Sequence, residues 1–168
     1  MIELALLVVF PLLMALAASS DLLTMTIPNR LALALVASFA VVALVAGLSL
    51  DALLMHVAAG ALILLATFTM FAFGWIGGGD AKFAAATALW LGFGVLLDYL
   101  LIAAVAGGFM TLALLAMRQV PLPGFAIRWR WLTHLHDNRT GVPYGIALAG
   151  AALAVYPQSE LWRVALAP

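Results

Sequence analysis

Long apolar runs separated by short polar connections are the feature of this sequence that most restricts its fold. At about 1.5 Å per residue, a helix over the 19 residues of the first run reaches roughly 28 Å, close to the ~30 Å hydrocarbon core of a bilayer. Only 8% of the 168 residues are charged, against about 25% in soluble domains. The pattern predicts an all-α, polytopic transmembrane bundle of about six spans, forming a single domain over residues 1–168. The runs are Ile2–Ser20, Leu31–Leu50, Ala52–Trp75, Lys82–Leu97, Tyr99–Met117 and Val142–Tyr156.

The basic residues are distributed very unevenly over the connections. With six spans, the connections that share one side hold six of the seven Lys and Arg residues, and the other side holds only Arg163. Cytoplasmic loops are the ones enriched in Lys and Arg, so this side is predicted to be cytoplasmic and both termini extracytoplasmic. The formal net charge is +0, which gives no electrostatic preference for nucleic acid. The six residues are Arg30, Lys82, Arg118, Arg128, Arg130 and Arg139.

Two aspartates, Asp21 and Asp80, lie at the predicted cytoplasmic boundary, each after an apolar run. A carboxylate is costly to keep near hydrocarbon, so such a residue is by default a candidate for function. The plain alternative is that both side chains cap helices or lie in solvated turns, since Asp is a favoured N-cap residue.

The sequence around each aspartate favours more than a cap. Three glycines, Gly77 to Gly79, precede Asp80, and glycine permits close approach of another backbone. The small residues Ala84–Ala86 follow, and small residues allow helices in lipid to pack tightly. After Asp21, the segment Ile27-Pro28-Asn29 interrupts the chain before the next run. We therefore expect a glycine-lined slot that could take an extended peptide.

A pair of carboxylates held close together has a specific chemistry. Because two such groups cannot both ionise easily, they share a proton. One can then act as general base on a water molecule while the protonated one polarises a carbonyl. The approach of Asp21 to Asp80 is a hypothesis at this stage.

Three blocks, taken in order along the chain, resemble the prepilin peptidases, which are polytopic GxGD aspartic peptidases. The first has Asp21 followed by Ile27-Pro28-Asn29, the second is the Gly-Gly-Gly-Asp-Ala-Lys sequence of residues 77–82, and the third contains Pro143-Tyr144-Gly145. The resemblance implies that Asp21 and Asp80 are the catalytic pair and that the neighbouring motif residues shape the site or bind substrate. These are Gly77, Gly78, Gly79, Lys82, Pro28, Asn29, Pro143 and Tyr144.

The same resemblance implies the partners and location. The substrate would be a prepilin or pseudopilin, cleaved at the cytoplasmic face of the bacterial inner membrane, in contact with lipid and without cofactor or metal. The chain has no cysteine and only nine residues between Asp21 and Leu31. It therefore lacks the cytoplasmic domain of the larger, bifunctional members and resembles the short peptidases of tight-adherence (Flp-type) pilus systems. N-methyltransferase activity is not expected.

Other functions were weighed against this one. A small transporter or channel could use both aspartates to bind a cation or relay protons. A non-enzymatic assembly subunit could use them only as helix caps. His134, His136 and Asp137 have metal-ligand side chains, but a site needs three or four positioned ligands, and no further His or Cys lies nearby. His56 is expected to pack between helices. The oligomeric state is left open.

Overall fold

The computed structural model of the chain describes residues 2–124 and 128–166, and within those ranges it contains helices and turns without strands. The all-α prediction is therefore confirmed for this part of the chain. The elements are α1 (Ile2–Thr24), α2 (Asn29–Val45), α3 (Leu50–Ala72), α4 (Gly78–Leu91), η1 (Phe93–Val95), α5 (Leu96–Arg118), α6 (Arg130–His136), α7 (Tyr144–Val155), η3 (Tyr156–Gln158) and α8 (Glu160–Leu166).

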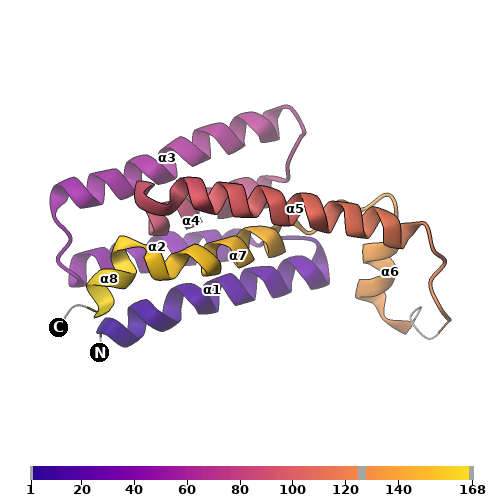
Figure 1. The fold of residues 1–168 in the computed structure, drawn as a ribbon, viewed down its shortest axis with the longest axis horizontal. Coiled ribbons are helices and arrows are strands. Elements are labelled where there is room, and N and C mark those ends of the chain that lie inside the picture. Colours follow the sequence, from indigo (N-terminus) through magenta and orange to yellow (C-terminus); the bar gives the residue numbers. More distant parts are fainter. Residues whose placement is uncertain (1, 125–127, 167–168) are drawn as a thin grey trace.

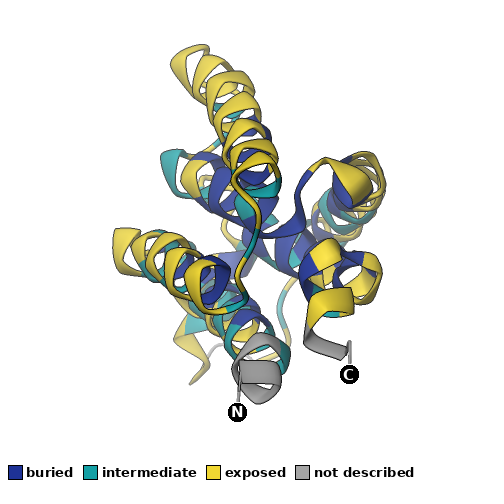
Figure 2. Ribbon diagram, turned by 90° about the vertical axis from the view of Figure 1, so that its left-hand side faces the viewer, coloured by how far each residue is buried: buried dark blue, intermediate teal, exposed yellow. Residues whose placement is uncertain are grey.

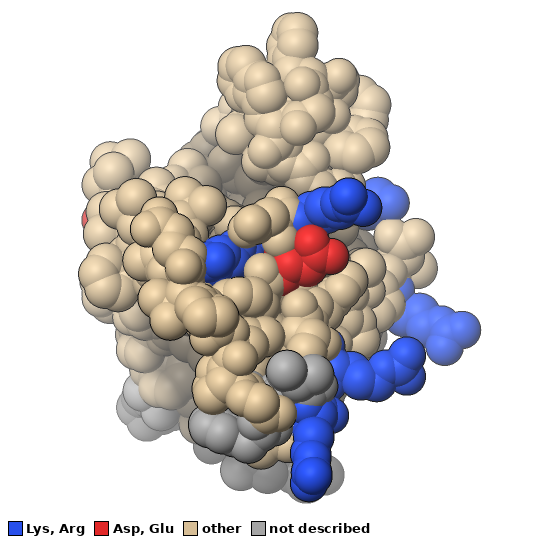
Figure 3. Space-filling view, turned by 90° about the vertical axis from the view of Figure 1, so that its right-hand side faces the viewer, with Lys and Arg blue, Asp and Glu red and all other residues tan. Residues whose placement is uncertain are grey.

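The long helices run side by side along one axis (Figure 1). The turns after α1 and α3 lie at the same end as α6, and both termini lie at the opposite end. The connections that the sequence places on one side therefore meet at one end of the bundle. Figure 3 views that end, where Lys and Arg side chains gather around a small acidic patch.

Within the described part of the chain, three helical segments are long and apolar enough to cross a membrane: Leu7–Thr24, Leu50–Ala72 and Phe93–Arg118. The helices α2, α4 and α7 are shorter, with 17, 14 and 12 residues. The sequence predicted about six spans; among the described residues three helices have full membrane length, and α2 is a shorter apolar helix.

The helix α4 lies at the centre of the bundle, where α2, α3 and α7 pack around it. Most of its side chains are buried, and many are alanines, which favour helix and allow close packing. On α3, Gly60 lies so close to Leu89 that an added Cβ would be 3.1 Å from the Leu89 Cβ. In Figure 2 the uppermost helix, which is α3 by its place in Figure 1, is exposed over most of its outer surface.

An aromatic cluster holds the helices together toward the end with the termini. Phe10 of α1 packs against Tyr156 and Trp90, with ring centroids 4.3 and 5.1 Å apart. The buried indole of Trp90 donates a hydrogen bond to the Leu35 carbonyl at 2.8 Å, as a buried polar group requires. This cluster joins α1, α2, α4 and η3, and thereby sets how α1 and α4 lie at the other end, where the aspartates are.

Candidate active site

Asp21 lies in the last turns of α1 and is buried, with 4% of its surface exposed. The apolar run ends at Ser20, but the helix continues to Thr24, so the carboxylate projects from a helix and not from a loop. Its Oδ2 accepts a hydrogen bond from the backbone N–H of Gly145 at 2.7 Å. This bond fixes the orientation of the carboxylate and joins α1 to the start of α7.

The turn after α1 is held by its own polar groups. Met25 has φ of 54°, a left-handed conformation that ends the helix. The Ser20 hydroxyl donates to the Thr26 carbonyl at 2.9 Å, and Pro28 provides the extended N-cap of α2. This geometry directs the chain back across the bundle and places Ile27 next to both aspartate motifs.

Asp80 is the third residue of α4, and Gly77 is the N-cap. The Asp80 carboxylate accepts a hydrogen bond from the Gly77 N–H, which resembles one half of a capping box. Burial and, to a smaller extent, the negative charge of Asp21 raise the pKa of Asp80 to about 6, against the lowering effect of the Gly77 bond. The N-cap position that the sequence suggested for Asp80 is therefore wrong, because Gly77 takes it and Asp80 bonds back to the cap from the third helical position.

Ile27 connects the two aspartate motifs physically. A Cβ added to Gly79 would lie 3.2 Å from the Ile27 carbonyl oxygen, and one added to Gly145 would lie 2.6 Å from its Cδ1. The glycine at each position thus allows the Ile27 backbone or side chain to pack directly against it. Neither Ile27 nor Gly145 was among the predicted site residues, although both belong to the quoted motifs.

Lys82 and Asn29 form a second link between the motifs. Lys82 Nζ donates to Asn29 Oδ1 at 3.0 Å, although the residues are 53 positions apart. Asp80 and Lys82 are two positions apart on α4, so they point to nearly opposite sides of that helix. The pair therefore lies behind the aspartates, and not between them.

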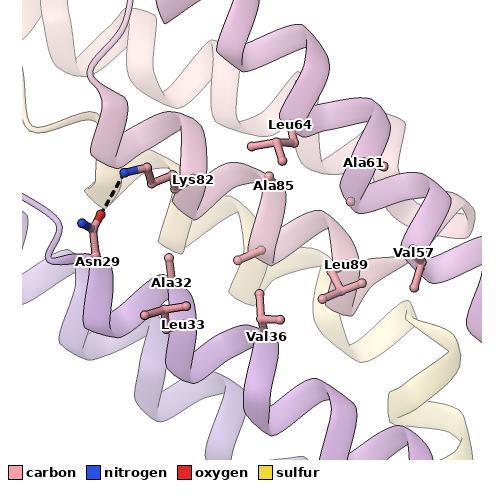
Figure 4. Close-up of a pocket in the computed structure, with 12 residues that line it drawn as sticks. Asn29, Ala32, Leu33, Val36, Val57, Ala61, Leu64, Lys82, Ala85 and Leu89 are labelled. Atoms are coloured by element: carbon pink, nitrogen blue, oxygen red, sulfur yellow. Dashed lines mark hydrogen bonds between the residues drawn. The ribbon is translucent and has the colours of Figure 1, made fainter.

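The Lys82–Asn29 pair closes one end of an apolar groove of about 570 Å³ (Figure 4). The groove runs between α2 and α3, and α4 forms its floor. Small side chains, among them Ala85 and Ala86, keep the floor low, while Leu33, Val36 and Leu64 line the walls. The groove adjoins both aspartate motifs, because Asn29 belongs to the first motif and Lys82 to the second.

The remaining predicted site residues have mainly structural contacts. Pro143 is the N-cap of α7, and the Tyr144 ring packs so closely on Gly107 of α5 that a Cβ there would be 2.1 Å from the ring. Gly78 faces the Phe71 ring of α3 and not the aspartates. The structure thus gathers Asp21, Asp80, Gly77 and Gly79 into one site and places Gly78, Tyr144, Lys82 and Asn29 around it.

Two aspartates, each accepting a hydrogen bond from a backbone N–H, thus lie in a helical bundle that contains helices of membrane-spanning length. A family model described as the type IV leader peptidase family matches residues 8–112, which include both aspartates. The chain belongs to this family. Searches of curated proteins and of solved structures gave no match. The family resemblance inferred from the motifs is therefore confirmed, and the transporter alternative is not favoured.

Proposed function

We propose that the protein is an aspartic endopeptidase that cleaves the leader peptide of Flp-type prepilins, with Asp21 and Asp80 as its catalytic pair. The observation that carries the proposal is that the two aspartate motifs meet at Ile27, close enough for the charge of Asp21 to raise the pKa of Asp80, although the two residues are 59 positions apart in the sequence (80 − 21). Helix capping alone explains the Asp80–Gly77 bond, but it does not explain why a second carboxylate is buried beside it.

The geometry favours different roles for the two groups. Asp80, with a pKa near 6, is the member that more readily carries a proton, so it is assigned to polarise the scissile carbonyl. Asp21, oriented by the Gly145 N–H, is assigned as general base. It takes a proton from water as the oxygen adds to the carbonyl carbon, while Asp80 protonates the carbonyl oxygen. When the C–N bond breaks, the proton on Asp21 passes to the leaving amine, and a hydroxyl proton of the gem-diol intermediate returns to Asp80 as the new carboxyl group forms.

The surroundings support a substrate with an apolar segment next to the cleaved bond. The groove between α2 and α3 ends at Lys82 and Asn29, and Lys82 is two positions after Asp80 on α4. If the apolar helix of the substrate lies in this groove, the extended substrate residues that precede that helix reach Gly77 and Gly79. The groove floor of small residues is suited to helix–helix packing in lipid.

The proposed topology follows from the distribution of charge. The α6 end, with its Lys and Arg residues, is assigned to the cytoplasm, so that six membrane-crossing helices leave both termini outside. Residues 1–168 then form one peptidase unit in the bacterial inner membrane, with the site at the cytoplasmic face and in contact with lipid. Without cysteines or a cytoplasmic domain, the chain is assigned peptidase activity without N-methylation.

The test is cleavage of a prepilin from the same genome, followed as a gel shift after co-expression. Asp21→Asn and Asp80→Asn should each lower the cleavage rate by at least 10²-fold, the lower end of what acid–base catalysis contributes. Asp51→Asn, an exposed carboxylate in the first turn of α3, is the matched control and should cleave like the parent. Unimpaired cleavage by either site variant, at equal membrane levels, would remove that aspartate from the mechanism.

A further inference from the structure

A second cavity lies at the end of the bundle away from the aspartates. Its volume is about 470 Å³, and the start of α3, the end of α4, η1, the start of α5, η3 and α8 form it. Unlike the groove beside α4, it has many polar groups in its wall. The polar side chains that matter here are His56, Asp98, Glu160 and Arg163.

His56 has one ring nitrogen without a partner. The residue is 2% exposed, and its Nδ1 lies 2.8 Å from the Leu89 carbonyl oxygen. A carbonyl only accepts, so Nδ1 carries the proton and Nε2 of the neutral ring is an acceptor. Among the residues that the structure describes, no group makes a hydrogen bond to the buried Nε2.

The nearest carboxylate does not satisfy this nitrogen. Glu160 Oε2 lies 3.8 Å from His56 Nε2, which is longer than a hydrogen bond. The Glu160 side chain is 60% exposed and can rotate without disturbing the core. Two acceptors facing each other at this separation leave room for a donor that bonds to both.

The choice of donor follows from the number and charge of the groups present. Over the described residues, no three metal-ligating side chains come together, and a protein metal site needs three or four. A primary ammonium has three N–H donors and a positive charge, so His56 Nε2 and Glu160 suffice to orient it. Asp98 adds a second negative charge to the cavity, and Arg163 provides a partner for an anion.

We propose that this cavity binds a phosphoethanolamine group, with its ammonium between His56 Nε2 and Glu160 and its phosphate on Arg163. The cavity also exposes Met55 and Phe93 in its wall, with 61% and 45% of their surfaces accessible. An apolar chain attached to the phosphate would leave the cavity along these side chains. The source of the group is either an aminophospholipid of the bilayer or a free phosphoethanolamine.

The experiment is a titration of the full chain in detergent micelles, with histidine labelled by ¹⁵N and the His56 Nε2 resonance observed. The probes are short-chain phosphatidylethanolamine, short-chain phosphatidylcholine and free O-phosphoethanolamine. Phosphatidylcholine has the same phosphate and the same charge but no N–H donors. Phosphatidylethanolamine should shift the Nε2 resonance saturably and bind at least tenfold more tightly than phosphatidylcholine.

Variants assign the contact to the two acceptors. Glu160→Gln should weaken phosphatidylethanolamine binding about tenfold, and Asp51→Asn, at the same end of the bundle, should leave it unchanged. His56→Phe should abolish selectivity for the primary ammonium. His56 is buried against Gly92, so its replacement could prevent folding. The binding result for Glu160→Gln, at an exposed side chain, is therefore sufficient to test the proposal.

The outcomes separate the sources and can overturn the proposal. Binding of the lipid without binding of O-phosphoethanolamine identifies the membrane as the source, and equal binding of both identifies the free group. The proposal is wrong if phosphatidylethanolamine and phosphatidylcholine bind equally, if neither shifts the His56 signal, or if Glu160→Gln binds like the parent. None of these results depends on peptidase activity.

Discussion

Lys82 Nζ and Asn29 Oδ1, 3.0 Å apart, join the start of α2 to α4, the helix that carries Asp80. Asn29 is the first residue of α2 and Lys82 lies in the second turn of α4. The bond therefore holds the turn containing Ile27 and Pro28 against the glycines that precede Asp80. We regard the two residues as positioning residues, because neither reaches the carboxylates.

Removing this link should reduce cleavage moderately. Lys82→Met and Asn29→Leu should each lower kcat/KM a few-fold, since an intramolecular hydrogen bond contributes about 0.5–1.5 kcal/mol and this one is exposed. The double variant should be no worse than the more impaired single variant, because both changes break the same bond. Losses that multiply would show that the residues act independently.

The contact of Gly145 with Asp21 predicts a much stronger effect. In Gly145→Ala the new Cβ would lie 2.8 Å from Asp21 Oδ2 and 2.6 Å from Ile27 Cδ1, so the carboxylate must move. We expect cleavage to fall about 10²-fold, the usual cost of a misplacement near 1 Å. Gly150→Ala on the same helix, where the Cβ meets nothing within 4 Å, is the control and should retain parental activity.

The pH dependence of cleavage should report the ionisation of Asp80. Its pKa of about 6 is raised from 3.8, so the group keeps its proton to higher pH than an ordinary aspartate. If the protonated carboxyl is the acid, kcat/KM falls tenfold per unit as the pH rises above about 6. The measurement is the initial cleavage rate at low substrate concentration between pH 5 and 8. A rate that stays constant over this range would contradict the assigned role of Asp80.

Filling the groove between α2 and α3 should block the substrate without unfolding the protein. Val36→Trp adds bulk at a wall residue that is 45% exposed, so the core is not disturbed. We expect KM for the prepilin to rise at least several-fold, with less effect on kcat. Val41→Trp on the same helix, 60% exposed and outside the groove, is the matched control. Equal kinetics for the two variants would place the substrate elsewhere.

Local sequence patterns predicted the helices and the two aspartates, but they could not establish what brings the aspartates together. The apolar runs mark the helices well, although α1 extends past Ser20 to Thr24. Asp21 fits into the helix because Gly145 bonds its carboxylate, and Thr24 fits because its hydroxyl bonds the Ser20 carbonyl. The importance of Gly145 depends on a contact across 124 positions, which no spacing rule contains. The unpaired Nε2 of His56 is likewise a property of packing between α3 and α4.

The hydrogen bond between Asp21 and Gly145 also has a consequence for the folding of the newly synthesised chain. A nascent chain of 142 residues already carries both aspartates, yet the N–H that orients the first of them has not been synthesised. Asp21 therefore acquires the partner that orients its carboxylate only when α7 packs between α1 and α5, after both aspartates have been synthesised.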